Sequence, residues 1–226
     1  MRRAIIFVNG NLSNLSQVKK IITKEDCLIA ADGGVKHILK LGLIPQIIIG
    51  DFDSTPLSIR KKLEREKIKW IKYPIKKDQT DFELAVDYCL GKKFREIIIF
   101  GILGDLIDHL IANIFLLAKI QTENKSVKIK IIEGNQELLI LNNEIIIKGK
   151  IGDEISIIPM SELKGVTTIG LEYKLDNETI PFGTTRGISN VFNKTTAIIK
   201  IKSGTALITH NSLRKDYLPN NKQQID

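Results

Sequence analysis

Short runs of isoleucine and valine alternate with segments of helical periodicity through the first half of the chain. A run that is apolar at every position is typical of a strand buried on both faces, as in a parallel sheet. Alternation of such strands with helices predicts an α/β domain with a mostly parallel sheet. The expected strands are Ala4–Val8, Cys27–Ala31, Gln46–Ile49, Lys69–Tyr73, Glu96–Phe100 and Lys128–Ile132. The expected helices are Ser16–Ile22, Gly34–Leu41, Pro56–Lys67, Phe82–Leu90 and Asp108–Ile120.

Two of these helices carry clear start signals. Ser54-Thr55-Pro56 places a capping residue ahead of a proline in the first turn. Thr80-Asp81-Phe82-Glu83 matches a capping box, which assigns Glu83 to helix capping in preference to a metal.

The pattern changes near Asn142 to short β-branched runs separated by turn residues. This spacing predicts a smaller all-β domain, an antiparallel sandwich or barrel. Its expected strands are Glu144–Lys148, Glu154–Ile158, Gly165–Ile169, Leu171–Leu175, Thr195–Lys202 and Thr205–Thr209. We therefore divide the chain into an α/β domain at 1–138, a β-rich domain at 139–212 and a polar tail at 213–226.

Composition narrows the class of protein. The chain has 226 residues, of which 43% are hydrophobic, and no apolar run approaches the length of a membrane span. The apolar stretch near the N-terminus is short and is interpreted as a strand, so a cytoplasmic protein is expected. The net charge of +8 comes mostly from dispersed lysines without interleaved aromatic residues, which does not favour nucleic-acid binding.

Aspartates gather just past the predicted strands. Asp51 and Asp53 follow Ile47–Ile49 directly, and Asp78 and Asp81 precede the next predicted helix. Carboxylates held close together repel one another unless a cation lies among them. Each aspartate alone is explained by a turn or cap role. The four together predict a Mg²⁺ site and, through Mg²⁺, a phosphate-bearing substrate.

Glycines mark the ends of the same strands. Asn9-Gly10, Asp32-Gly33-Gly34, Gly50 and Gly101-Ile102-Leu103-Gly104 each follow a predicted strand. In a parallel sheet these ends share one edge, where such folds bind ligands. Turn geometry alone also explains any single glycine there.

In order and spacing, these motifs resemble thiamine pyrophosphokinase of the bacterial type. The matching segments are Asp32–Gly34, Gly50–Ser54, Asp78–Asp81, Gly101–His109 and Pro181–Asn190. The resemblance implies transfer of a diphosphate from ATP to the hydroxyl of thiamine, which gives thiamine diphosphate and AMP. It also implies a homodimer, with sites formed between the two domains and partly across the dimer.

The resemblance assigns roles to individual residues. It implies Mg²⁺–ATP binding and alcohol activation by Asp51, Asp53, Asp78 and Asp81, with Asp108 beside the reacting groups. The implied nucleotide-binding residues are Asp32, Gly33, Gly34, Gly101, Gly104 and His109. The implied thiamine-binding residues are Arg186, Ser189 and Asn190.

One departure from the family pattern concerns the phosphate contacts. The family has Gly-Arg where this chain has Asp105-Leu106, and Leu106 cannot supply a bidentate contact to phosphate. Arg186, Lys76 or Lys77 are candidates to compensate. Three alternatives therefore stay open: another alcohol such as a hydroxymethylpterin, a non-catalytic thiamine or nucleotide binder, and a nucleic-acid binder.

Overall fold

The computed structural model describes residues 2–104 and 106–212, which form two compact units divided between Ile140 and Leu141. Asp105 and the predicted tail at 213–226 lie outside the described residues. The predicted fold class, a mostly parallel α/β domain followed by a smaller all-β domain, is confirmed. Within the described residues, no helix is long and apolar enough to cross a membrane.

The first unit contains a sheet of seven strands in the order β4-β3-β2-β1-β5-β6-β7. The first six are parallel, and β7 returns antiparallel to β6. The strands are β1 Arg3–Phe7, β2 Cys27–Ala31, β3 Ile47–Gly50, β4 Lys69–Lys72, β5 Glu96–Phe100, β6 Lys128–Glu133 and β7 Gln136–Leu141. The predicted domain boundary at 138/139 falls inside β7, a strand that the sequence analysis missed.

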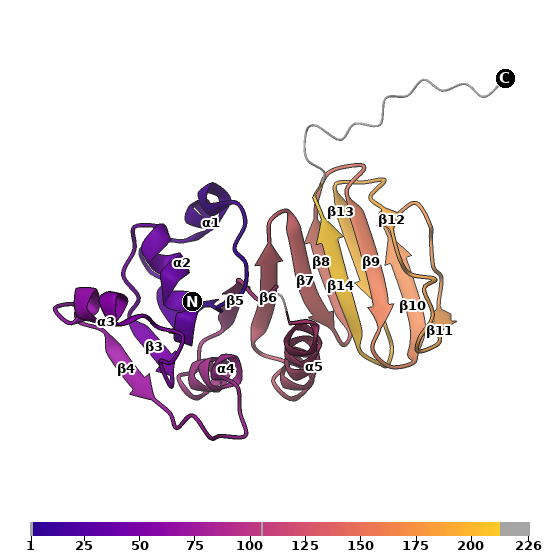
Figure 1. Ribbon diagram of the computed structural model, residues 1–226. Helices are drawn as coiled ribbons and strands as arrows, with labels where there is room; N and C mark the ends of the chain where they lie inside the picture. The colour runs from indigo at the N-terminus through magenta and orange to yellow at the C-terminus, as the bar shows by residue number, and fades with distance from the viewer. Residues whose placement is uncertain (1, 105, 213–226) are drawn as a thin grey trace. The chain divides into compact units, whose positions relative to one another are not determined.

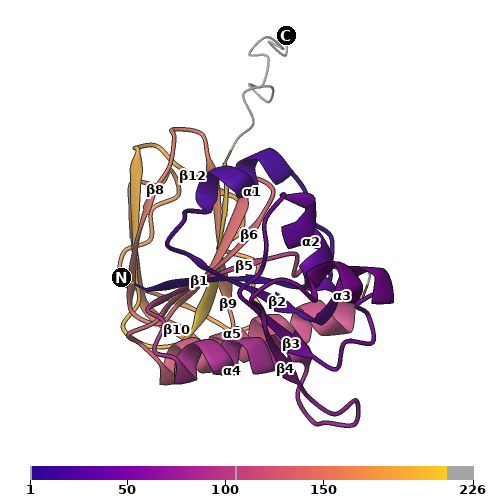
Figure 2. The same ribbon diagram turned by 90° about the vertical axis from the view of Figure 1, so that its left-hand side faces the viewer.

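Helices cover both faces of this sheet (Figures 1 and 2). Alternate residues of β1 point to opposite faces, so Ile5 and Phe7 pack with α1, α2 and α3, while Ala4 and Ile6 pack with α4 and α5. The helices are α1 Leu15–Ile21, α2 Val35–Lys40, α3 Leu57–Leu63, α4 Asp81–Gly91 and α5 Ile107–Glu123, with a 3-10 turn η1 at Asp32–Gly34. Burial on both faces explains why the central strands β1, β2, β3 and β5 are apolar along most of their length.

The second unit, orange and yellow in Figure 1, contains two antiparallel sheets. One has the order β12-β9-β14 and the other β11-β10-β13-β8. The strands are β8 Glu144–Lys148, β9 Glu154–Pro159, β10 Leu163–Ile169, β11 Glu178–Ile180, β12 Asn190–Val191, β13 Thr196–Lys200 and β14 Ala206–Asn211. Alternate residues of β9 and β13 are buried, as expected for sheets with one face on a core.

Two sequence predictions are wrong in detail. The segment Leu171–Leu175 alternates apolar and polar residues as a strand does, but Tyr173 is exposed and the segment forms a loop whose one bridge joins Leu171 to Phe192. Its backbone bonds are divided between backbone and side-chain partners, since Glu172 N donates to Val191 O at 2.9 Å and Leu175 N donates to Thr168 Oγ1 at 2.9 Å. The helix predicted to reach Lys67 ends at Leu63, its one buried residue, since no further apolar side chain follows before Ile68.

Candidate active site

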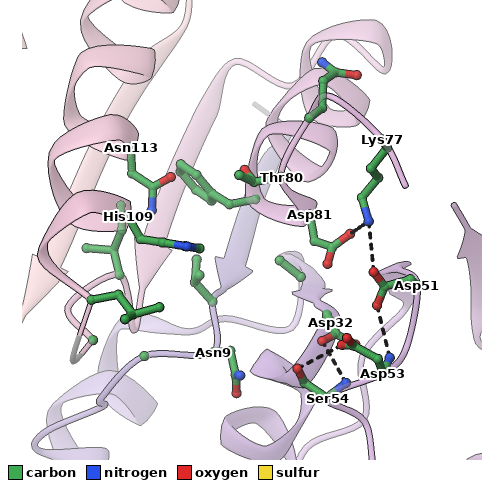
Figure 3. A pocket seen from close by; sticks show the side chains of 18 of the residues that line it. Asn9, Asp32, Asp51, Asp53, Ser54, Lys77, Thr80, Asp81, His109 and Asn113 are labelled. Carbon is green, nitrogen blue, oxygen red and sulfur yellow. Dashed lines mark hydrogen bonds and ion pairs between the residues drawn. The ribbon is translucent and has the colours of Figure 1, made fainter. Parts of the chain in front are cut away.

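A cavity of about 550 Å³ lies in the first unit at the carboxyl ends of the parallel strands (Figure 3). Asn9 and Gly10 enter it after β1, and Asp32 enters it after β2. The segment after β3 adds Asp51 and Asp53. The remaining polar walls come from the segment before α4 and from the start of α5, with Lys77, Gln79, Thr80, Asp81, His109 and Asn113. The sheet edge predicted from the sequence is therefore where the structure has its cavity.

Asp32 is the most buried carboxylate of the cavity, at 6% exposure. It begins η1 with a φ of 42°, a conformation that L-residues seldom adopt. Its two oxygens accept hydrogen bonds from Thr55 Oγ1 at 3.1 Å and from Ser54 N at 3.3 Å. Thr55 therefore braces Asp32, and the predicted side-chain cap of α3 is not formed.

Asp51 and Asp53 flank a buried aromatic anchor. Phe52 is 7% exposed and packs edge-on against Trp70, with ring centroids 5.2 Å apart. Its φ of 69° turns the chain, and Asp51 Oδ1 accepts from Asp53 N at 3.1 Å. The segment is therefore a tight turn and does not continue β3 in an extended conformation. The turn nevertheless brings both carboxylates to the cavity.

The carboxylates of Asp32, Asp51 and Asp53 approach closely enough to share a cation. One oxygen from each lies within 4.8 Å of the others. Gly50 leaves the space for this approach, because a Cβ there would lie 3.0 Å from Asp32 Cβ and 3.1 Å from Asp81 Cγ. Carboxylate oxygens are ligands that Mg²⁺ prefers. The residues present therefore fit a divalent cation.

Lys77 links two carboxylates of the acidic cavity. Its Nζ lies 3.1 Å from Asp51 Oδ2 and 3.1 Å from Asp81 Oδ1. The Asp53 N–H and Lys77 lower the pKa of Asp51 against the opposing effect of burial. Burial raises the pKa of Asp81, and the charges of Asp51 and Asp32 act in the same direction while Lys77 opposes them. Asp81 thus retains a proton more readily than Asp51 does.

The N-terminus of α4 holds Asp81 in place. Thr80 caps this helix, since its Oγ1 accepts from Glu83 N at 3.1 Å, as the capping motif predicted. Lys77 lies in the segment before the helix, four residues ahead of Asp81, and the two side chains form an ion pair at 3.1 Å.

Several predicted residues lie outside the cavity wall. Asp78 is exposed and does not line the cavity, although it is adjacent to Lys77 in the chain. Asp108 is also exposed, and its Oδ1 accepts from His109 N at 2.9 Å. Gly33, Gly34 and Gly101 are buried in the turns behind the wall. Gly104 and His109 do line the cavity.

The sequence analysis placed Asn9 at the ligand-binding edge without giving it a role, and it missed Asn113 as a cavity residue. Asn9 precedes a glycine at the end of β1, and Asn113 lies one helical turn after His109, so both positions had a detectable signal. Leu106 lines the cavity as well, which places the family's arginine position at the wall. Of the candidates to compensate for that arginine, Lys77 lies in the cavity, whereas Lys76 is exposed and is not among the lining residues.

The three residues predicted to bind thiamine lie in the second unit, in and beside one loop. Asn190 is 6% exposed; its Oδ1 accepts from Tyr173 N at 3.0 Å, and its Nδ2 donates to Tyr173 O at 2.7 Å. Ser189 is exposed, has a φ of 55° and donates its N–H to Ser156 Oγ. Arg186 forms an ion pair with Glu178. Asn190 thus organises the loop that presents Ser189.

The acidic cavity at the ends of parallel strands defines an α/β protein suited to bind a cation together with a phosphate-bearing ligand. The family model "Thiamin pyrophosphokinase, catalytic domain" matches residues 18–131, and "Thiamin pyrophosphokinase, vitamin B1 binding domain" matches residues 142–207. The chain belongs to the thiamine pyrophosphokinase family.

Individual relatives agree with this assignment. The chain is 36% identical over 192 residues to the thiamine pyrophosphokinase of Bacillus subtilis, and the alignment covers 83% of this chain and 89% of the relative. It is 28% identical over 222 residues to thiamin pyrophosphokinase 1 of Caenorhabditis elegans, with coverage of 90% and 86%. A crystal structure of the B. subtilis thiamine pyrophosphokinase superimposes with a TM-score of 0.84 over 93% of this chain and 99% of that structure, at 29% identity.

Proposed function

We propose that this protein is a thiamine pyrophosphokinase, which transfers the diphosphate of ATP to the hydroxyl of thiamine and releases AMP. The observation that carries the proposal is the acidic cluster of Asp32, Asp51 and Asp53, with oxygens within 4.8 Å of one another. This cluster lies inside the segment matched by the family's catalytic-domain model. The first unit accordingly takes the ATP-binding role and the second unit the thiamine-binding role.

Mg²⁺ is the cation proposed for the cluster. When bound, Mg²⁺ neutralises phosphate charge, on which diphosphate transfer chiefly depends. Asp32, Asp51 and Asp53 would hold it, because their oxygens converge and Thr55 and Ser54 fix the orientation of Asp32. Asp81 stands beside them and would orient the attacking alcohol. The roles of Asp78 and Asp108 in metal binding and catalysis stay predictions, since both are exposed and lie outside the cavity lining.

The other binding roles follow the same division of the chain. Gly104 and His109 would contact the nucleotide at the wall formed by the start of α5. Ser189 and Arg186 would contact thiamine from the second unit. Asn190 keeps one amide hydrogen for a ligand after its bond to Tyr173 O, and its main effect would be on the shape of the loop.

A homodimer in the cytoplasm completes the proposal. The exposed face of α5 carries Ile107, Ile111 and Phe115 at intervals of four residues, with exposures of 72%, 49% and 55%. Residues at this spacing share one side of a helix, and an apolar stripe of this kind supports association with a second copy. The cytoplasm supplies the ATP that the reaction consumes.

The direct test is AMP formation from ATP and Mg²⁺ with thiamine present, absent, or replaced by a hydroxymethylpterin. Thiamine-dependent release of AMP is the expected result. Release with the pterin alone would keep the chemistry and change the substrate. Ligand binding without AMP release in any arm would make the protein a binder and refute the proposal.

Substitution of the cluster tests the site itself. Asp51→Asn and Asp53→Asn should each reduce turnover by at least about a hundredfold, because each removes a charge that balances the cation. Asp176→Asn is the matched control, since this carboxylate is on the surface of the second unit with its side chain 75% exposed. Circular dichroism should show all three variants folded. Turnover within tenfold of wild type in both cluster variants would remove the argument for the metal site.

A further inference from the structure

Lys77 occupies the position between two carboxylates of the acidic cavity. Its Nζ is 3.1 Å from both Asp51 Oδ2 and Asp81 Oδ1, and it donates a hydrogen bond to Pro74 O at 3.2 Å. The lysine side chain is 14% exposed, so it is held inside the cavity and does not extend into solvent. Figure 3 shows the ammonium between the two carboxylates on the same side of the cavity.

The charges of the cavity are unbalanced. Its described lining contains four carboxylates, those of Asp32, Asp51, Asp53 and Asp81, and within that lining Lys77 is the one lysine or arginine. Since like charges at short distance raise the free energy of the ligand-free protein, the ammonium offsets part of this repulsion. Lys77 therefore acts as an internal counter-ion.

The ammonium and a divalent cation compete for the same ligand. Asp51 pairs with Lys77 through Oδ2. The same carboxylate also converges with those of Asp32 and Asp53. Mg²⁺ binds carboxylate oxygens at about 2.0–2.1 Å and strongly repels a neighbouring ammonium. Strong binding of the metal to Asp51 therefore requires the ammonium of Lys77 to move away.

We propose that Lys77 holds the cation-binding carboxylates in the ligand-free protein and transfers to the phosphates of ATP when the metal–nucleotide complex binds. This inference rests on the proposed function for the identity of the phosphate ligand. The lysine has a flexible stem and lies on the segment between β4 and α4, so its ammonium can turn within the cavity without movement of the sheet. Leu106 stands at the position where the family has an arginine, and Lys77 then supplies a positive charge to the phosphates.

This movement of Lys77 from the carboxylates to the phosphates, the exchange, makes a prediction for metal binding in the absence of nucleotide. Removal of the competing ammonium should strengthen the binding of Mn²⁺, used as a spectroscopic probe for Mg²⁺, by about fivefold or more in Lys77→Met and Lys77→Gln. Lys76→Met is the matched control, because it removes the same charge from the adjacent exposed residue outside the cavity and should change Mn²⁺ affinity less than about twofold. Electron paramagnetic resonance of free Mn²⁺ measures each affinity.

A purely structural role for Lys77 would give the opposite result. If the lysine only braces the carboxylates, its removal loosens the site, and Mn²⁺ affinity stays equal or falls. Equal or weaker binding in both Lys77 variants, with melting curves that show them folded, overturns the proposal. An equal gain in Mn²⁺ affinity in Lys76→Met also overturns the proposal, because the gain would then come from the loss of any nearby positive charge and not from the position of Lys77.

Kinetics complete the test and separate it from the proposed function. With saturating ATP and Mg²⁺, Lys77→Met should lower kcat by about tenfold or more and leave the KM for thiamine unchanged, because the lost contact is to phosphate. An active wild type with unchanged Mn²⁺ affinity in the variants would refute the exchange and leave the proposed function standing. If the wild type shows no turnover and the Lys77 variants bind Mn²⁺ more tightly, the competition between the ammonium and the metal is supported and the proposed function is refuted.

Discussion

Replacement of Gly50 by alanine tests whether the spacing of the carboxylates, and not only their presence, is required. Gly50 ends β3 with a φ of 150°, inside the region that favours glycine. A Cβ there would lie 3.0 Å from Asp32 Cβ, 3.1 Å from Asp81 Cγ and 3.2 Å from Asp81 Oδ1. Comfortable separations between carbon atoms are about 3.5–4.0 Å, so Asp32 and Asp81 must move apart by about half an ångström.

The magnitude of the effect follows from these contacts. The unfavourable backbone conformation should lower the free energy of unfolding by about 1–3 kcal/mol. A misplacement of catalytic groups by about 1 Å can cost about a hundredfold in rate, so a shift of about half that size should lower turnover by about tenfold. Both turnover and stability are therefore expected to fall in Gly50→Ala.

Gly42→Ala provides the matched control. Gly42 has a φ of 72°, and no heavy atom lies within 4 Å of the position of its added Cβ. This variant should lose about 1–2 kcal/mol of stability through backbone strain alone. Its turnover should equal that of wild type, because Gly42 is not among the residues that line the cavity.

Urea denaturation and thiamine-dependent AMP release, measured on the same preparations, provide the assay. The expected pattern is a comparable loss of stability in both variants and a loss of turnover confined to Gly50→Ala. Turnover of Gly50→Ala within threefold of Gly42→Ala, with both proteins folded, would refute the reasoning that the carboxylates need this spacing.

Two further predictions concern a buried ion pair and the cavity wall. Asp26 accepts from Arg3 Nε at 2.7 Å and from Thr23 N at 2.7 Å, so Asp26→Asn should cost about 2 kcal/mol at pH 7. Burial alone would raise the pKa of Asp26, but these bonds lower that pKa overall in the folded protein. The stabilisation is therefore present at pH values above the unfolded pKa of about 3.9, and it is lost as the pH falls below this value. The difference in unfolding free energy between wild type and Asp26→Asn should thus shrink from pH 7 to pH 3, and an undiminished difference would contradict the assignment. Leu106→Arg should lower the KM for ATP by about tenfold through a charged contact to phosphate, and an unchanged or higher KM would show that Leu106 faces no phosphate.

The fold could be predicted from the sequence because its signals are local. Apolar runs such as Ile47–Ile49 and Glu96–Phe100 are strands that need both faces covered, and the intervening helices supply that cover. Failures occurred where local and tertiary signals conflict. The sequence of Leu171–Leu175 alternates as that of a strand does, but several of its backbone groups bond to the side chains of Thr168 and Asn190 and not to a neighbouring strand.

The candidate site was only partly predictable for the same reason. The cavity is lined by Asp32, Asp51, Asp53 and Asp81, which the sequence placed near strand and helix ends, because the strand ends of a parallel sheet converge on one edge. Their binding roles stay predictions. Asp78 and Lys77 are neighbours in the chain, yet the lysine enters the cavity and the aspartate is exposed. No periodicity distinguishes adjacent residues of a loop.

The sequence by itself therefore determined the α/β and all-β division, the edge of the sheet that bears the site and the family of the protein, because periodic burial and motif spacing are encoded along the chain. The tertiary structure decided which carboxylate oxygens of the cavity converge and that the ammonium of Lys77 lies beside them. Those features depend on distances between segments far apart in the sequence, such as the approach of Thr55 to Asp32 and of Lys77 to Asp51. Such distances are set by packing in three dimensions, and the order of residues does not reveal them.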